Sequence, residues 1–162
     1  MVALQRRVDR ALANVEVALE QRHDELPDLV AAVRGVLGVE RSVLIDVARL
    51  RGQWSAKASL PQQAATADAT SVALRRLFAV VEAYPELRSQ QNVLALQEEI
   101  ERLETVIAGR RELFNEQVYQ LDATIAQVPA VFQADLFGSL PRASFEGERA
   151  ERERPSASPL PS

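Results

Sequence analysis

Few side chains in this 162-residue sequence could carry acid–base or metal chemistry, and the first candidate spacing is Glu20-Gln21-Arg22-His23. Glu-x-x-His on a helix supplies ligands in bundle proteins that hold two metal ions, but such a centre needs the motif on two helices. The chain has one histidine and no cysteine, so a second motif cannot exist. We therefore expect His23 to be a helix-surface residue, and we expect no metal and no cofactor.

A second set of candidates is acidic and lies within a few turns of predicted helix: Glu98, Glu99, Glu101 and Glu104. Neighbouring carboxylates could bind a cation or exchange protons with a substrate. Arg102 and other arginines nearby offer these carboxylates ion-pair partners, so we expect a solvated helix face. Phosphate-binding glycine loops and serine-nucleophile motifs are absent from the sequence. The sequence thus predicts no catalytic residue and no enzyme activity.

Three polar residues in one predicted helix are candidates for lining a groove. Arg110 falls on the apolar stripe of that helix, where a guanidinium must be paired or must reach water along its flexible stem. Arg111 and Asn115 lie one turn apart on one face. Together with Arg22 and Asp24, Arg111 and Asn115 define an alternative function, that of an enzyme or small-molecule binder with a polar groove between helices.

Helices must position these residues, because 6 glycines, 8 prolines and 5% aromatic residues leave little material for a β fold. Apolar residues recur every three or four positions and predict helices over about 2–25, 29–54, 66–84 and 89–128. We expect a break or kink at Pro27, a cap at Asp24 and a loop over 59–63. The last helix would be about 60 Å long and cannot bury its stripe alone. The prediction is an all-α, antiparallel up-and-down bundle of about four helices, one of them very long.

The end of the chain has a different pattern. Apolar residues between Pro129 and Glu146 lack a sustained period, and we expect them to form an irregular strap over the bundle. The following residues alternate Glu with Arg and then become rich in proline and serine, which predicts a disordered tail. The predicted organisation is a bundle over 1–146 and a tail over 147–162.

Charge and hydropathy narrow the classes of partner. The formal net charge is −4 and the pI is about 5.2, which argues against a nucleic acid partner. The sequence contains neither a membrane-spanning apolar run nor a signal peptide, so the chain as given is expected to be soluble and cytoplasmic. The near-heptad spacing of the last helix leaves open another alternative, a self-associating coiled-coil protein that forms a homo-oligomer.

Four blocks along the chain carry a resemblance to a known family. They are Glu20 through Val30 leading to Glu40; Glu82-Ala83-Tyr84-Pro85-Glu86-Leu87 continuing to Gln97; Arg111 through Asn115; and Leu136-Phe137-Gly138 followed by Pro141-Arg142 and Phe145-Glu146. In this order the blocks resemble the LemA family of bacterial membrane-associated proteins. The sequence departs from the family pattern in the long helix, where Thr105-Val106 replaces an Asn-Arg pair and Gly109 replaces an aromatic residue.

The resemblance implies a non-enzymatic interaction or scaffold protein of the cell envelope that binds one or more protein partners. The candidate partner or groove residues are Arg22, Asp24, Pro27, Arg110, Arg111 and Asn115. Members of the family carry an amino-terminal transmembrane helix before the segment at which this chain starts. We expect that this anchor was trimmed or that the start was assigned downstream, rather than that the chain is a soluble variant. Arg6, Arg7 and Arg10 would then follow the inner membrane and place the bundle in the cytoplasm.

Overall fold

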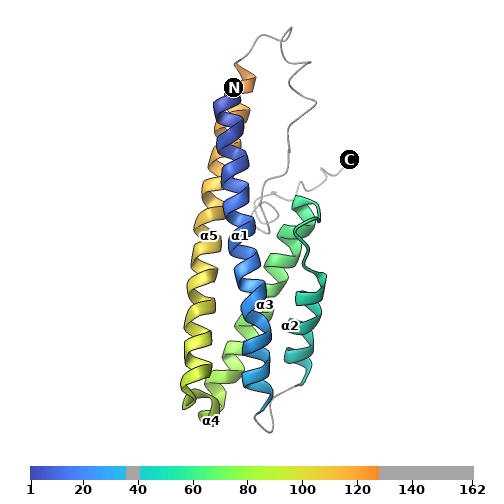
Figure 1. Ribbon diagram of the computed structural model, residues 1–162, viewed down its shortest axis with the longest axis vertical. Helices are drawn as coiled ribbons and strands as arrows, with labels where there is room; N and C mark the ends of the chain where they lie inside the picture. The colour runs from blue at the N-terminus through green and yellow to red at the C-terminus, as the bar shows by residue number, and fades with distance from the viewer. Residues whose placement is uncertain (36–40, 128–162) are drawn as a thin grey trace, which may run out of the picture.

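The computed structural model describes residues 1–35 and 41–127, and this part of the chain is helical without any strand (Figure 1). The helices are α1 (Val2–Arg34), α2 (Arg41–Gln53), α3 (Leu60–Ala83), α4 (Pro85–Arg88) and α5 (Gln91–Ala126). Consecutive long helices reverse direction, and α4 is the short corner between α3 and α5 (Figure 1). The predicted all-α up-and-down bundle is confirmed.

Two helices dominate the architecture. α1 has 33 residues and α5 has 36, which correspond to about 50 and about 54 Å at 1.5 Å per residue. They lie side by side in opposite directions, and the shorter α2 and α3 form a second pair beside them (Figure 1). Close packing joins α1 to α5, α2 to α3 and α1 to α2, whereas α3 and α5 are not closely packed along their lengths.

The break predicted at Pro27 is wrong, because α1 runs through Pro27 without interruption to Arg34. A proline inside a helix costs about 3 kcal/mol. Leu26, Leu29 and Val33 are fully buried around it, and each buried side chain of this kind contributes about 1.5–3 kcal/mol. Burial on both sides of the proline therefore outweighs its local cost, and Asp24 lies inside the helix rather than at a cap.

The beginning of α3 also differs from the prediction, since the expected loop over 59–63 is already its first turn. The side-chain oxygen of Gln62 accepts a hydrogen bond from the backbone N–H of Ser59 at 3.2 Å. Pro61 lies in the first turn, where its missing N–H costs no helical hydrogen bond. The serine, proline and glutamine that suggested a loop thus form a helix start.

Two groups of buried side chains form the interior. One, the four-helix core, draws on every helix; its buried members are Leu26, Leu29, Val30, Val33, Leu44, Val47, Leu50, Ala73, Leu74, Leu77, Val81, Leu87, Val93 and Ile100. The other, the α1/α5 core, draws on α1, α5 and the start of α3; its buried members are Val8, Ala11, Val15, Ala18, Leu19, Ala64, Ala67, Ile107, Phe114, Leu121 and Ile125. A polar layer lies between the two cores.

Some predictions fall outside the described residues. These are the strap after Pro129 and the disordered tail over 147–162. Within residues 1–35 and 41–127, no helix combines the length and the apolar character that crossing a membrane requires.

Candidate functional site

The polar layer is centred on Arg22, which is 2% exposed although its guanidinium is charged. Arg22 comes three residues after Leu19 and four before Leu26, so it shares the inward face of α1 with these buried leucines. Its Nη1 donates to Oε1 of Glu104 at 2.5 Å and to Oγ of Ser71 at 2.8 Å, and its Nη2 donates to the carbonyl of Ala67 at 3.2 Å. The guanidinium is therefore held by both α3 and α5.

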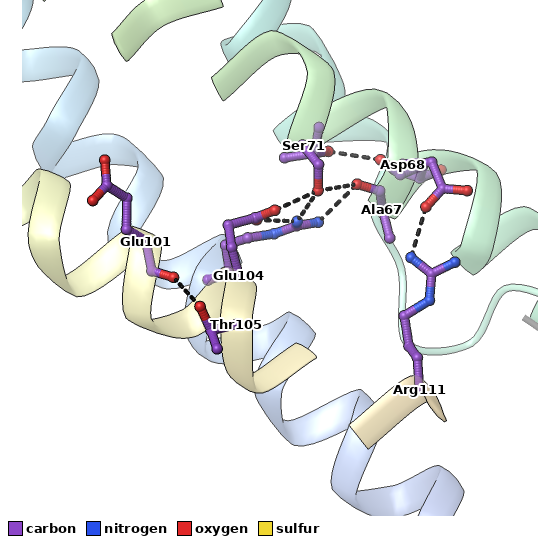
Figure 2. Close-up of polar contacts among 10 residues, drawn as sticks. Ala67, Asp68, Ser71, Glu101, Glu104, Thr105 and Arg111 are labelled. Carbon is purple, nitrogen blue, oxygen red and sulfur yellow. Dashed lines mark hydrogen bonds and ion pairs between the residues drawn. The ribbon is translucent and has the colours of Figure 1, made fainter. Parts of the chain in front are cut away.

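Ser71 closes the network on the α3 side (Figure 2). Its Oγ lies 2.6 Å from Oε2 of Glu104 and 3.1 Å from the carbonyl of Ala67. Both carboxylate oxygens of Glu104 are thus engaged, although its side chain remains 29% exposed. A buried ion pair compensates for its desolvation only when further hydrogen bonds satisfy the remaining polar atoms, and Ser71 and Ala67 supply them. The network cross-links three helices between the two cores.

A second ion pair joins α3 to α5 nearby. Nη1 of Arg111 donates to Oδ1 of Asp68 at 2.6 Å (Figure 2). Asp68 precedes Ser71 by three residues, and Arg111 follows Glu104 by seven, so both pairs use the same facing sides of the two helices. Side chains therefore bridge α3 and α5 where their backbones do not pack closely.

These ion pairs border a groove of about 570 Å³ between α3 and α5. Its polar lining residues are Asp68, Ser71, Arg75, Glu104 and Arg111. Its apolar lining residues are Ala65, Ala69, Val72, Ile107 and Ala108. The groove combines an apolar wall of mostly small side chains with charges that are largely paired with one another.

The other predicted residues lie elsewhere. Asp24 is exposed on α1, with Oδ1 3.3 Å from Nδ1 of His23, and does not line the groove. Pro27 lines a smaller groove of about 210 Å³ between α1 and α2. Arg110 is half-buried and donates from Nη1 to the carbonyl of Asn14 at 2.7 Å, which ties α5 to α1.

The four residues of the alternative enzyme or binder site are thus distributed over the bundle. Arg111 lines the α3/α5 groove, and Arg22 lies behind Ser71 and Glu104, which line it. Asn115 is half-buried on α5 one turn beyond Arg111. Asp24 is not among the lining residues, so the structure does not bring all four side chains to one groove.

Sequence reasoning missed the roles of Asp68 and Ser71, and it placed Glu104 on the solvated face. Glu104 directly follows Leu103 and precedes Ile107 by one turn, so it lies at the edge of the apolar stripe; this position was the available signal. The solvated-face prediction is right for Glu99, whose Oε1 accepts from Nη2 of Arg102 at 2.6 Å. That hydrogen bond lowers the pKa of the Glu99 carboxyl and raises the pKa of Arg102.

His23 lies at the surface of α1, half-covered by Trp54, with the ring centroids 5.1 Å apart. Over residues 1–35 and 41–127, histidine and acidic side chains do not gather in threes at any point that could hold a metal ion.

Comparison with known proteins identifies the family to which the chain belongs. None of the curated proteins matches it significantly. The profile of the LemA family matches residues 11–158, which include α1 from Ala11 onward, the α3/α5 groove and most of the sequence that follows α5. The resemblance inferred from the four sequence blocks is confirmed, and the chain belongs to the LemA family.

Proposed function

We propose that this protein is a non-enzymatic scaffold that binds an apolar polypeptide segment of a protein partner in the α3/α5 groove. The observation that carries the proposal is the pairing of the groove's own charges. Glu104 is engaged by Arg22, and Asp68 is engaged by Arg111. These carboxylates stabilise the bundle, and their lone pairs already accept hydrogen bonds that a substrate or a metal would have to displace.

The wall of the groove favours a polypeptide as its ligand. Ala65, Ala69 and Ala108 are small and leave room for another backbone to approach closely. Val72 is 38% exposed beside them and offers apolar contact. Interfaces of this kind place an apolar patch at the centre and polar groups at the rim.

Arg75 adds a charge preference. It lines the groove and has no ion-pair partner among the residues that the structure describes. An arginine at the rim of an apolar patch is suited to a carboxylate of the bound segment, which its planar guanidinium can hold with two hydrogen bonds. We therefore expect the partner segment to combine apolar side chains with an aspartate or glutamate.

The test replaces Val72 by arginine and compares partner capture from the native host with that of the unmodified chain. Val72→Arg should abolish capture, because the charge fills the apolar wall, while helical content and melting temperature stay unchanged since Val72 already reaches solvent. Ile45→Arg on α2 is the matched control, because Ile45 is 61% exposed and lies outside the groove. Equal capture by both variants would contradict the proposal.

The association with the envelope is a further part of the proposal. Arg6, Arg7 and Arg10 are exposed near the start of α1, at one end of the bundle (Figure 1). Basic residues next to a membrane favour its cytoplasmic side. We propose that this end faces the inner membrane from the cytoplasm; after expression from the native locus, the bundle should fractionate with membranes and resist protease added outside the cell. Digestion by external protease would contradict this placement.

A further inference from the structure

The smaller groove between α1 and α2 shares no lining residue with the α3/α5 groove, and its volume is about 210 Å³. Ala31 and Ala48 are small side chains on its opposite walls, and they leave open a space that larger side chains would fill. The half-buried ring of Pro27 and the side chains of Val30 and Val47 give the groove an apolar surface. The α1/α2 groove is therefore suited to an apolar group of modest size.

Two arginines complete the lining of the α1/α2 groove. Arg34 belongs to the last turn of α1, and Arg51 belongs to the last turn of α2. The two helices run in opposite directions, so these last turns lie at opposite ends of the groove (Figure 1). Side chains on a helix lean toward its N-terminus, so both arginines lean toward the middle of the groove. Two guanidinium groups can therefore reach the same acidic group of a ligand.

The positive charge of these arginines is not compensated within the groove. Neither the Arg34 nor the Arg51 guanidinium has a hydrogen-bond or ion-pair partner in residues 1–35 and 41–127, and none of the described lining residues is acidic. The nearby carboxylate of Asp46 on α2 is paired with Arg49 instead, at 3.4 Å between Oδ1 and Nη2. By contrast, both carboxylates of the α3/α5 groove are paired with arginines. An apolar groove with two unpaired cations complements an anion that carries an apolar group.

We propose that the α1/α2 groove binds a small organic carboxylate, with the carboxylate between Arg34 and Arg51 and the apolar part against the ring of Pro27. A planar guanidinium holds a carboxylate with two parallel hydrogen bonds, so two arginines can engage both of its oxygens. A cavity of about 150 Å³ accommodates a benzene molecule, so this groove fits a ligand of roughly ten non-hydrogen atoms. The site is separate from the proposed partner site, and either can exist without the other.

The probe is sodium octanoate, whose size matches the groove, titrated into the isotope-labelled full-length chain at neutral pH. Amide chemical shifts should change over residues 26–34 and 47–51, with a dissociation constant on the order of 1 mM. Octylammonium has the same chain with the opposite charge and should not bind. Acetate and inorganic phosphate lack the apolar chain and should bind more weakly by about tenfold or more.

Three variants locate the binding. Arg34→Gln/Arg51→Gln should weaken octanoate binding by about tenfold or more, because hydrogen bonds to a charged group are lost. Arg41→Gln/Arg49→Gln is the matched control, since it removes two exposed arginines of α2 that lie outside the groove, and it should bind octanoate like the unmodified chain. Ala48→Leu should abolish binding by filling the groove. Ala48 is exposed, so circular dichroism should show unchanged helical content for this variant.

Several results would overturn the inference. Equal octanoate binding by the groove and control double variants would do so, as would undiminished binding by Ala48→Leu or shift changes confined to the α3/α5 groove. Equal binding of octylammonium would indicate an apolar surface without charge recognition. No octanoate binding at about 10 mM would leave the two arginines only the role of complementing the dipoles of their helix ends. Val72→Arg does not alter the α1/α2 groove and should bind octanoate normally, so the inference and the proposed function can fail independently.

Discussion

The four-helix core and the α1/α5 core are built from different side chains. In the four-helix core, side chains from the four long helices and one from the short α4 surround one another, and its buried members are almost all leucine, isoleucine and valine. In the α1/α5 core, four of the buried members are alanine: Ala11, Ala18, Ala64 and Ala67. Small residues let backbones approach closely where fewer helices are available, but they bury less apolar area per residue. The four-helix core thus buries more apolar area per residue than the α1/α5 core, and we expect it to contribute more to the stability of the bundle.

The largest expected effects compare one leucine from each core. Leu77→Ala in the four-helix core should lower the free energy of unfolding by about 4 kcal/mol, because a fully enclosed site cannot collapse around the cavity. Leu121→Ala in the α1/α5 core should cost about 2 kcal/mol, since two helices can relax toward each other. Urea denaturation measures both values. An equal or larger loss for Leu121→Ala would show that a buried leucine contributes as much stability in the α1/α5 core as in the four-helix core.

Substitutions in the polar layer between the cores should have the second-largest effect on the free energy of unfolding. Glu104→Leu should cost about 3 kcal/mol, because it leaves the buried guanidinium of Arg22 without its counter-charge. The double variant Arg22→Met/Glu104→Leu should recover to within about 1 kcal/mol of the unmodified chain, since an apolar pair needs no compensation. The same denaturation experiments test this. A double variant less stable than Glu104→Leu would contradict this expectation, because it would show that the Arg22–Glu104 pair stabilises the fold more than an apolar pair does.

The ion pair between Asp68 and Arg111 at the rim of the groove should contribute less to stability than the Arg22–Glu104 pair. Asp68→Asn removes the counter-charge of Arg111 at a position where both side chains are partly exposed. Such pairs typically contribute about 0.2–1 kcal/mol, and thermal unfolding of Asp68→Asn should show a loss in this range. A loss as large as that of Glu104→Leu would contradict this ranking, because the Asp68–Arg111 pair would then contribute as much stability as the Arg22–Glu104 pair.

The smallest effect is expected on the solvated face of α5, outside both cores. The hydrogen bond from Arg102 lowers the pKa of Glu99, so the pair stabilises the folded state above the ordinary glutamate pKa and loses this effect as the pH falls through the lowered value. At neutral pH, Glu99→Gln should leave the melting temperature unchanged within error, because the pair is exposed to solvent. Titration by NMR should show the lowered pKa of Glu99, and an ordinary value would contradict the pairing.

Apolar periodicity in the sequence predicted the four long helices and their order, because each helix buries one stripe. It misplaced the boundary between α1 and α2, because Pro27 disfavours a helix locally while Leu26 and Leu29 are buried by distant segments. Ser59 and Pro61 were misread for a related reason, since the same residues start helices and form loops. Local sequence preferences thus predict the helices correctly but misplace their ends where burial against distant segments determines the boundary.

The candidate site was less predictable than the fold. The sequence singles out Arg111, but its partner Asp68 is 43 residues away in the chain. Arg22 and Glu104 are separated by 82 residues and meet only when α1, α3 and α5 are assembled. Spacing within one helix carries no information about such pairs. A charged residue on an apolar stripe, such as Arg22, is the signal that a partner must come from elsewhere.

We propose that the buried charges hold the bundle together, whereas the surface of the groove binds a partner. Partner capture by the double variant Arg22→Met/Glu104→Leu tests this most directly. That variant removes the buried ion pair beside the groove but keeps Val72 and the alanine residues of the groove wall. The variant should fold and capture the same partner as the unmodified chain. A folded double variant that no longer captures the partner would contradict it and would make the Arg22–Glu104 pair part of the function.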